Sequence, residues 1–174
     1  DFQDPESFEV AQDRLLAVHL LDRRDGSRRR LSAKRWVFAL GPWTDGAMAR
    51  WFDESRTRLR LSAGIHLWFD AVPGCDRPWA ILRPQGRILF VIPRGGRLQV
   101  GTTEREVAEG WVPIVEAERE DLLQALELNL PALPWRQMLV REEELGVRPL
   151  VAAEGKTTHL SREAVLEPHP RFLN

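Results

Sequence analysis

Two polar residues stand inside apolar, strand-like runs and are the strongest candidates for chemistry. His66 lies in the run IHLWF at residues 65–69, and Arg148 lies in LGVRPLV at residues 145–151. A polar side chain in a half-buried strand needs a hydrogen-bond or ionic partner. A neutral imidazole can accept a proton, and a guanidinium group can hold an anion with two parallel hydrogen bonds. The two residue types could therefore supply a general base and an anion clamp.

Each of these residues also has a purely structural explanation. A lone histidine on a half-buried strand is more often a satisfied core residue than a catalyst. Arg148 could equally form a buried ion pair with one of the many glutamates or bind a substrate anion. Residue type and spacing leave both alternatives open.

Other kinds of site have little support in the sequence. The four histidines show no metal-ligand spacing, and the single cysteine, Cys75, excludes an internal disulfide and favours a reduced, cytosolic setting. No nucleophile–base pattern surrounds Thr102 and Thr103. The net charge of -1 gives no reason to expect nucleic-acid binding, and no apolar run approaches the ~20 residues of a spanning helix. We therefore predict a globular protein without a metal site or a nucleic-acid partner.

A β-hairpin at residues 88–103 is the clearest local structure in the chain. Two β-type runs, 88–93 and 98–103, flank a Gly-Gly pair at 95–96, and glycine supplies the positive φ angles of a primed two-residue turn. The first run is apolar on both faces, which predicts a strand in the middle of a sheet and covered on both sides. The turn fixes a register in which Val91 faces Val100 and Phe90 faces Gly101.

The remaining elements should place the two candidate residues on the same sheet. Residues 59–69 read as two short strands broken at Ala63-Gly64, and strands 65–69, 79–83, 88–93 and 98–103 are predicted to form an antiparallel meander. Residues 115–130 have the apolar stripe of a long helix, with Glu118 among the charged residues of its solvated side. A strand at 145–151 then carries Arg148. The predicted fold class is α+β with a mostly antiparallel sheet.

Upstream of the hairpin, the pattern predicts three strands followed by a helix. The strands are at 7–12, 14–23 and 28–40, with a turn at Asp25-Gly26 and an apolar run at 36–40. The arginines between residues 23 and 30 are interpreted as a solvated hairpin tip rather than an anion site. Gly41-Pro42-Trp43 then leads into a helix, an arrangement in which backbone N–H groups can meet a phosphate or a ring carbonyl. No glycine fingerprint for dinucleotides is present.

Five motifs together resemble a known family. GPWTD, LRLSAGIHL, RILFVIP, VGTTE and GVRPLVA followed by LSRE occur in this order from about residue 7 to 173. In order and separation they resemble the FAD-dependent glycerol-3-phosphate dehydrogenases, which are quinone-linked flavoenzymes with close oxidase variants. The chain starts at Asp1 without methionine and stops after a strand-like stretch, so we expect it to be an internal segment of a longer enzyme.

The resemblance implies a two-domain flavoenzyme. Residues 1–47 would be a β-meander and return segment of the FAD domain, in which Gly41, Pro42 and Trp43 touch the cofactor. Residues 48–174 would form most of a substrate-binding domain whose antiparallel sheet covers the flavin ring.

The resemblance also implies a reaction and roles for three residues. The family oxidises sn-glycerol 3-phosphate to dihydroxyacetone phosphate with hydride transfer to the flavin. His66 takes the position of the active-site histidine, Arg148 that of the arginine beside the substrate, and Arg162 that of a second arginine. The electron acceptor would be a quinone or oxygen. The parent protein would be cytoplasmic, either peripheral on the inner membrane or homodimeric.

The chain also departs from the family pattern. The glycine fingerprint for FAD and the C-terminal stretch that supplies a substrate lysine are absent from these 174 residues. Leu40 replaces Thr or Ala before GPW, Glu104 replaces Asp after GTT, and Arg94 replaces Trp after FVIP. We therefore expect the isolated segment to bind FAD poorly and to be inactive. The alternatives are a flavin oxidase or dehydrogenase of another hydroxy or amino acid, and a non-catalytic binding module.

Overall fold

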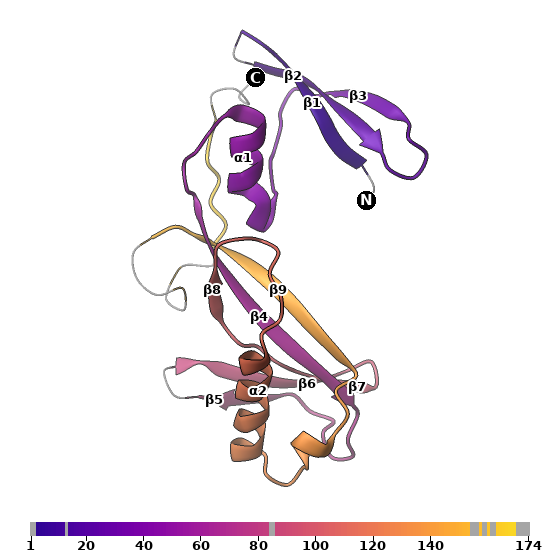
Figure 1. Cartoon of the computed structure of the whole chain (residues 1–174), viewed down its shortest axis with the longest axis vertical. Coiled ribbons are helices and arrows are strands. Elements are labelled where there is room, and N and C mark those ends of the chain that lie inside the picture. Colours follow the sequence, from indigo (N-terminus) through magenta and orange to yellow (C-terminus); the bar gives the residue numbers. More distant parts are fainter. Residues whose placement is uncertain are drawn as a thin grey trace. The chain divides into compact units, whose positions relative to one another are not determined.

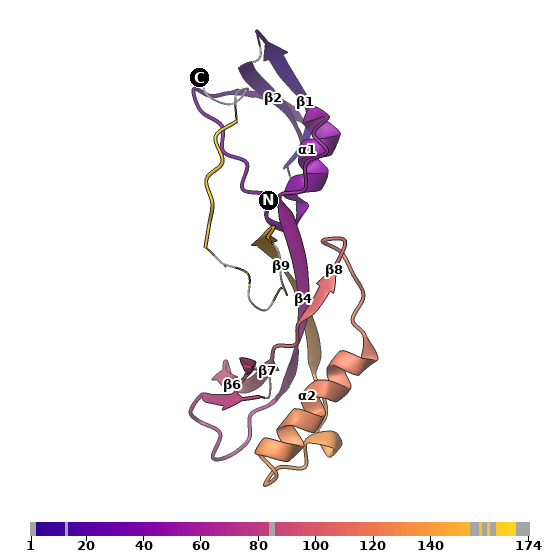
Figure 2. The ribbon, with the colours of Figure 1, turned by 90° about the vertical axis from the view of Figure 1, so that its left-hand side faces the viewer.

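The computed structural model describes residues 3–12, 14–83, 86–153, 157, 160 and 163–169. The chain divides into two compact units, which are described separately (Figures 1 and 2). The N-terminal unit comprises Asp1–Leu40, Thr44–Arg56 and Glu163–Asn174, and the sheet unit comprises Gly41–Trp43 and Thr57–Arg162. The assignment of residues 1–47 to a flavin domain and 48–174 to a substrate domain stays a prediction.

The N-terminal unit is a small antiparallel sheet with one helix. Its strands β1 (Gln3–Ala11), β2 (Arg14–Asp22) and β3 (Arg28–Ser32) lie in that order, and α1 spans Thr44–Phe52. The predicted turn between the second and third strands is confirmed: Gly26 has a φ of +72° and its N–H donates to the Asp22 carbonyl at 2.8 Å. The core combines Leu15 and Val18 of β2 and Met48 of α1 with aromatic side chains from several segments: Phe8, Trp36, Phe38, Trp51 and Phe52.

The prediction that the third strand runs to Leu40 is wrong. β3 ends at Ser32, and residues 36–40 are irregular. The apolar side chains of this segment fill the core instead of extending the sheet: Phe38 lies 5.6 Å from Phe52 in an edge-on arrangement, measured between ring centroids. Trp36 donates from Nε1 to the Leu15 carbonyl at 2.9 Å. Aromatic packing against α1 thus replaces strand pairing.

The arginine-rich turn of the N-terminal unit is neutralised by carboxylates on β1 and at the end of β2. Four of its arginines form ion pairs: Arg23 with Asp4, Arg24 with Asp22, Arg28 with Glu6, and Arg30 with Glu9. The Glu9 carboxylate also receives a bond from His19, and its pKa is lowered to about 2, first by Arg30 and then by His19. Such pairing favours a solvated structural turn over an anion site.

The sheet unit is built around one long strand, β4 (Leu59–Asp70), visible at the centre of Figure 1. β9 (Glu142–Val151) pairs along one edge of β4. β7 (Arg97–Gly101) and β8 (Arg105–Val107) share the other edge, and β6 (Ile88–Arg94) and β5 (Trp79–Leu82) continue beyond β7. All of these pairings are antiparallel, so the predicted α+β class is confirmed.

Two expectations about this sheet are wrong in detail. β4 is continuous and has no break at Ala63-Gly64, because β9 pairs with it from residue 59 to residue 68. The interruption is on the opposite edge of β4, where residues 61–63 pair with β8 and residues 66–70 pair with β7. The strand order also departs from a simple meander, since β4 lies beside β7 rather than beside β5.

The predicted hairpin is confirmed in turn and register. Phe90 pairs with Gly101 and Val91 pairs with Val100, and Gly95 and Gly96 take φ angles of +59° and +74°. The expectation that β6 is covered on both faces is wrong. Leu89 and Val91 are fully buried, whereas Phe90 is 42% exposed on the other face.

One layer of helix explains this difference between the two faces of the sheet. α2 (Glu116–Asn129) lies against one face only, where Leu122 and Leu126 are fully buried (Figures 1 and 2). The short η3 helix (Trp135–Gln137) adds Trp135, whose ring meets Phe69 edge-on at 5.6 Å. The predicted helix at 115–130 is thus confirmed to within one residue at each end. In the described part of the chain, no helix is long and apolar enough to span a membrane.

Candidate functional site

The face of the sheet turned away from α2, here called the open face, carries both candidate residues. Side chains of directly paired strand residues point to the same side of a sheet. His66 pairs with Gly101 on β7 and with Glu144 on β9, and Gly101 pairs in turn with Phe90 on β6. By the same alternation, the residues on this side of the sheet are Ser62, Gly64, His66 and Trp68 of β4, Glu144, Gly146 and Arg148 of β9, and Ile88, Phe90 and Ile92 of β6. Ser62 and Gly64 are nevertheless buried.

The imidazole of His66 lies across its neighbour on β7. A Cβ atom placed on Gly101 would lie 2.5 Å from the His66 Cδ2 atom and 2.8 Å from the Ile65 carbonyl oxygen. The ring can occupy this position because residue 101 has no side chain. The glycine that ends the hairpin therefore makes room for the candidate base.

His66 is held in its neutral form. Partial burial lowers its pKa from the usual 6.5, and the positive charge of Arg148 lowers it further, whereas the carboxylate of Glu144 acts in the opposite direction. The net shift is downward. An imidazole that is neutral at physiological pH can accept a proton, which is the property required of a general base.

Glu144 is a site residue that sequence reasoning missed. It sits directly opposite His66, and its Oε2 atom accepts hydrogen bonds from Trp68 Nε1 at 3.1 Å and Gln99 Nε2 at 3.2 Å. These two donors fix the carboxylate on the open face beside the imidazole. The signal was available in the period of two that places Glu144 and Arg148 on the same face of one strand.

Arg148 occupies the same face, further along the sheet. It pairs with Ser62, four residues from His66 on β4, which corresponds to roughly 13 Å along the strand. Its Nη2 atom donates to Thr102 Oγ1 at 3.0 Å, and Thr102 donates in turn to the Thr103 carbonyl at 3.1 Å. Because an arginine side chain is long, its cation can approach the region between these two positions.

A paired set of glycines lies between the imidazole and the guanidinium. Gly64 of β4 pairs with Gly146 of β9, midway between the His66–Glu144 and Ser62–Arg148 pairs. A Cβ atom on Gly146 would meet nothing within 4 Å. The open face therefore has bare backbone at Gly146, between a base and a cation, whereas Gly64 beside it is covered by Thr102 and Thr103.

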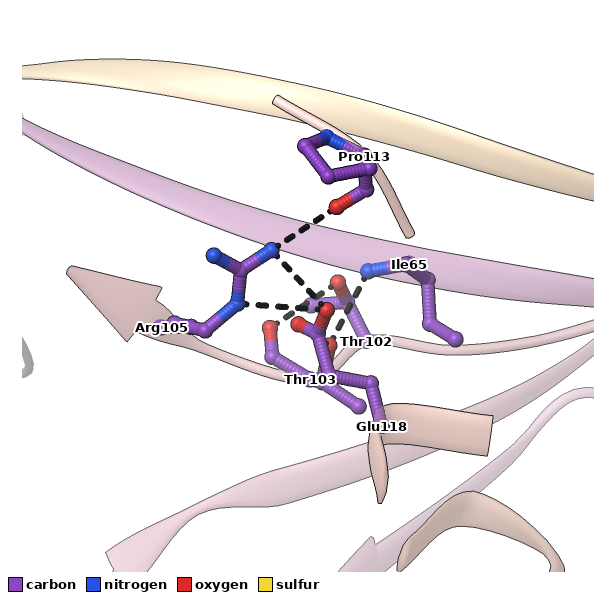
Figure 3. Close-up of polar contacts among 6 residues, drawn as sticks. All are labelled: Ile65, Thr102, Thr103, Arg105, Pro113 and Glu118. Atoms are coloured by element: carbon purple, nitrogen blue, oxygen red, sulfur yellow. Dashed lines mark hydrogen bonds and ion pairs between the residues drawn. The ribbon is translucent and has the colours of Figure 1, made fainter. Parts of the chain in front are cut away.

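A polar cluster on the opposite side of the sheet supports this region (Figure 3). The expectation that Glu118 faces solvent is wrong: it is only 7% exposed and accepts hydrogen bonds from Thr103 and Arg105. Thr103 is also buried, and its hydroxyl accepts a bond from the Ile65 N–H at 3.0 Å. The acidic start of a helix gave no sequence signal that one carboxylate would turn inward.

The predicted cofactor-contact segment folds as a short helix. Gly41–Trp43 forms η1 within the sheet unit, with a φ of +57° at Gly41. Trp43 is 62% exposed, and its indole passes close to Gly110, where an added Cβ atom would lie 3.1 Å from Nε1. Pro42 also approaches Gly110. The cofactor role of Gly41, Pro42 and Trp43 stays a prediction.

Arg162, the proposed second arginine, lies outside the described residues. Among the residues that the structure describes, no group of three or more His, Cys, Asp and Glu side chains could hold a metal ion. The structure thus brings His66 and Arg148 to one face of one sheet and adds Glu144 and Thr102 beside them.

Comparisons with known proteins give this arrangement a context. The profile of the family described as FAD dependent oxidoreductase matches residues 7–171. Aerobic glycerol-3-phosphate dehydrogenase of Staphylococcus epidermidis is 29% identical over 143 residues, which are 80% of this chain and 26% of the relative. The Staphylococcus aureus protein of the same name is 27% identical over the same coverage. The chain thus spans about a quarter of the length of the curated relatives it matches.

Solved structures agree with the sequence comparison. Glycerol-3-phosphate dehydrogenase from Bacillus halodurans, complexed with FAD, matches with a TM-score of 0.71 and 27% identity, over 87% of this chain and 32% of that protein. Iminodiacetate oxidase from a Chelativorans species matches with a TM-score of 0.60 and 19% identity, over 88% of this chain and 38% of that protein. The second match shows a shared fold alone.

Proposed function

The chain belongs to the FAD-dependent oxidoreductase family, and from this premise we propose that it is the substrate-binding part of an enzyme that oxidises sn-glycerol 3-phosphate to dihydroxyacetone phosphate. One observation carries the proposal: a neutral, half-buried histidine and an arginine share the open face of a sheet whose solved relative is a glycerol-3-phosphate dehydrogenase.

The open face fits a flat aromatic cofactor. It presents a row of partly exposed apolar side chains on β6, formed by Ile88, Phe90 and Ile92. Phe90 and Ile92 pair with β7, the strand beside His66. Binding sites for cofactors of this kind are mostly apolar with a few placed polar groups. Bound FAD would supply the acceptor for the two electrons released by the alcohol. Gly41, Pro42 and Trp43 are the residues that we expect to touch the cofactor, on the strength of the family resemblance.

His66 would act as the base of the oxidation. Oxidation of a secondary alcohol requires loss of the hydroxyl proton, and a neutral imidazole nitrogen can take it. Burial and Arg148 keep the pKa of His66 low, so the ring is unprotonated at neutral pH. Glu144, held by Trp68 and Gln99, would stabilise the imidazolium once it has formed.

Arg148 would hold the phosphate. A guanidinium fork matches phosphate oxygens, and the Thr102 hydroxyl accepts a hydrogen bond from the Nη2 atom of Arg148 at 3.0 Å, which orients the group on the open face. The bare backbone at Gly146, between Glu144 and Arg148 on β9, would leave room for a three-carbon chain between the phosphate and the reacting hydroxyl. Arg162 is proposed as a second phosphate contact from the resemblance of its LSRE motif.

Further properties of the whole enzyme are proposed from the resemblance. The electron acceptor would be a quinone or oxygen. A cytoplasmic protein, attached peripherally to the inner membrane or forming a homodimer, would suit the quinone-linked members. The competing proposal is oxidation of another hydroxy or amino acid by the same fold.

The proposal can be tested in the protein encoded by the complete reading frame. Substrate-dependent dye reduction is measured with glycerol 3-phosphate, glycerol and a series of amino acids. Arg148→Gln should raise KM for glycerol 3-phosphate by about tenfold or more, as for the loss of a charged hydrogen bond, while His66→Gln should lower kcat by about 100-fold. The matched control is Arg97→Gln, which removes an exposed arginine paired with Glu142 elsewhere on the sheet. Activity with an amino acid and none with glycerol 3-phosphate would refute the proposed substrate.

A further inference from the structure

Glu118 is a buried carboxylate that takes no direct part in the chemistry proposed for His66 and Arg148. It lies in the first turn of α2, on the side of the sheet opposite the open face, and is 7% exposed. A buried carboxylate is costly unless hydrogen bonds and an opposite charge compensate for lost hydration. Its neighbours Glu116 and Glu120, by contrast, are exposed. The burial of one carboxylate among several calls for a specific role.

Both oxygens of Glu118 are engaged, one by Thr103 in the segment between β7 and β8 and the other by Arg105 at the start of β8 (Figure 3). Oε1 accepts a hydrogen bond from the Thr103 hydroxyl at 2.9 Å. Oε2 accepts from Arg105 at 3.3 Å (Nε) and 3.2 Å (Nη2), and the same Nη2 atom donates to the Pro113 carbonyl at 3.0 Å. The carboxylate thus fixes the start of α2 to the β7–β8 connection.

Thr103 passes this constraint to β4. Its hydroxyl donates to Glu118 and accepts from the backbone N–H of Ile65 at 3.0 Å, so that both of its functions are used. Ile65 lies between the residues of β4 that pair with β8 (61–63) and those that pair with β7 (66–70). The threonine side chain therefore takes the place of a strand partner next to His66.

Thr102 passes the same constraint to Arg148. Its hydroxyl donates to the Thr103 carbonyl at 3.1 Å and accepts from Arg148 Nη2 at 3.0 Å. Gly64 allows this connection, because an added Cβ atom would lie 2.3 Å from the Thr103 carbonyl oxygen and 2.5 Å from Thr102 Oγ1. The two threonines thus extend from one side of the sheet to the other.

We propose that Glu118 is a positioning residue, which fixes the Arg148 guanidinium through Thr103 and Thr102 and fixes the backbone beside His66 through Thr103 and Ile65. It does not touch the substrate. The inference rests on the proposed function of Arg148 and His66 as anion clamp and base. The Glu118 carboxylate thereby determines the distance between the Arg148 guanidinium and the His66 imidazole. A ligand whose anionic group and hydroxyl are a fixed distance apart binds more tightly when this distance matches its own.

The test compares Glu118→Ala with Glu118→Gln, which keeps an acceptor for Thr103 but gives up the charge that faces Arg105. Glu120→Ala is the matched control, because it removes an exposed carboxylate of the same helix that pairs with Arg136. In the 174-residue chain, NMR follows the Arg148 Nε–Hε signal and the pKa of His66. In the complete protein, steady-state kinetics gives KM and kcat for glycerol 3-phosphate.

Glu118→Ala should move both NMR observables and raise KM by about tenfold, with a smaller change in kcat. Glu118→Gln should restore most of KM, and Glu120→Ala should change nothing. Unchanged Arg148 and His66 signals in Glu118→Ala would overturn the proposal. So would equal losses in the alanine and glutamine variants.

A second variant covers the case in which Glu118→Ala does not fold. Thr102→Val removes the hydroxyl that meets Arg148 and leaves the contacts of Glu118 intact. It should shift the Arg148 signal and raise KM while the urea midpoint stays near that of wild type, and an unmoved Arg148 signal would contradict the proposal. Because the NMR measurement needs no substrate, inactivity of the wild type with glycerol 3-phosphate refutes the proposed function alone.

Discussion

The glycine pair at the centre of the open face gives the sharpest structural prediction. Gly64 and Gly146 are directly paired residues on neighbouring strands, yet an added methyl group would meet very different surroundings. At Gly64 it would lie 2.3 Å from the Thr103 carbonyl oxygen, a backbone atom that cannot swing aside. At Gly146 it would meet nothing within 4 Å. Neither glycine has a positive φ angle, so steric contact alone separates the two.

The size of the difference follows from these distances. Gly64→Ala requires the Thr102–Thr103 segment to move by about 1 Å, and overpacking of this kind costs about 1–3 kcal/mol. Gly146→Ala reduces the freedom of the unfolded chain and should stabilise by about 0.4–1 kcal/mol. The two variants should therefore differ by about 1.4–4 kcal/mol in the free energy of unfolding.

Urea denaturation measures this difference directly. With a slope of about 2 kcal/mol per molar, the midpoint of Gly64→Ala should lie about 0.7–2 M below that of Gly146→Ala. Gly64→Ala should also shift the NMR signal of the Arg148 side chain, because Thr102 holds its Nη2 atom. Equal midpoints for the two variants would refute the placement of Thr102 and Thr103 over β4.

Three other predictions concern the base, the turn and the core. The pKa of His66, measured by NMR, should lie below 6.5, and a pKa above 6.5 would contradict the stated causes. The stability linked to this shift should be fully present above pH 6.5 and be lost as the pH falls through the lowered pKa, and this pH dependence should be absent from His66→Gln. Gly96→Ala should lower the free energy of unfolding by about 1–2 kcal/mol because the φ angle of Gly96 is +74°, whereas Gly95→Asn should lower it less, because asparagine tolerates the φ of +59° at that position. Equal urea midpoints for the two variants would argue against a primed turn. Leu126→Ala should lower the free energy of unfolding by about 2–5 kcal/mol because that side chain is fully buried against the sheet, whereas Leu128→Ala should change it by no more than about 0.5 kcal/mol because Leu128 is 75% exposed. Thermal melts compare the two variants, and similar losses would mean that α2 packs by a different face.

Local patterns were sufficient to predict the hairpin and the long helix. The Gly-Gly turn fixes the pairing of Phe90 with Gly101, and the apolar spacing of Leu122 and Leu126 fixes the buried side of α2. Arg148 was correctly placed on a strand after the helix because proline at 149 holds the preceding residue extended. These features depend on interactions close in sequence.

The errors come from contacts between residues distant in sequence. The apolar run at 36–40 looks like a strand, but its aromatic rings pack on α1 instead. The helix pattern places Glu118 on the solvated side, but hydrogen bonds from Thr103 and Arg105 hold its carboxylate in a buried position. The uncovered side of β6 has the same composition as a buried one, and only the tertiary arrangement shows that α2 covers a single face. Glu144 was missed because its partner across the sheet, His66, is remote in the chain.

In the proposed function, His66 and Arg148 serve the oxidation of a phosphorylated alcohol in a flavoprotein. The most direct measurement is anaerobic mixing of the FAD-loaded complete protein with glycerol 3-phosphate, followed by the absorbance of the oxidised flavin. We predict rapid bleaching with glycerol 3-phosphate, much slower bleaching with glycerol, and loss of the preference between them in Arg148→Gln. Equal rates with both alcohols in the wild type, or bleaching by an amino acid alone, would contradict the claim.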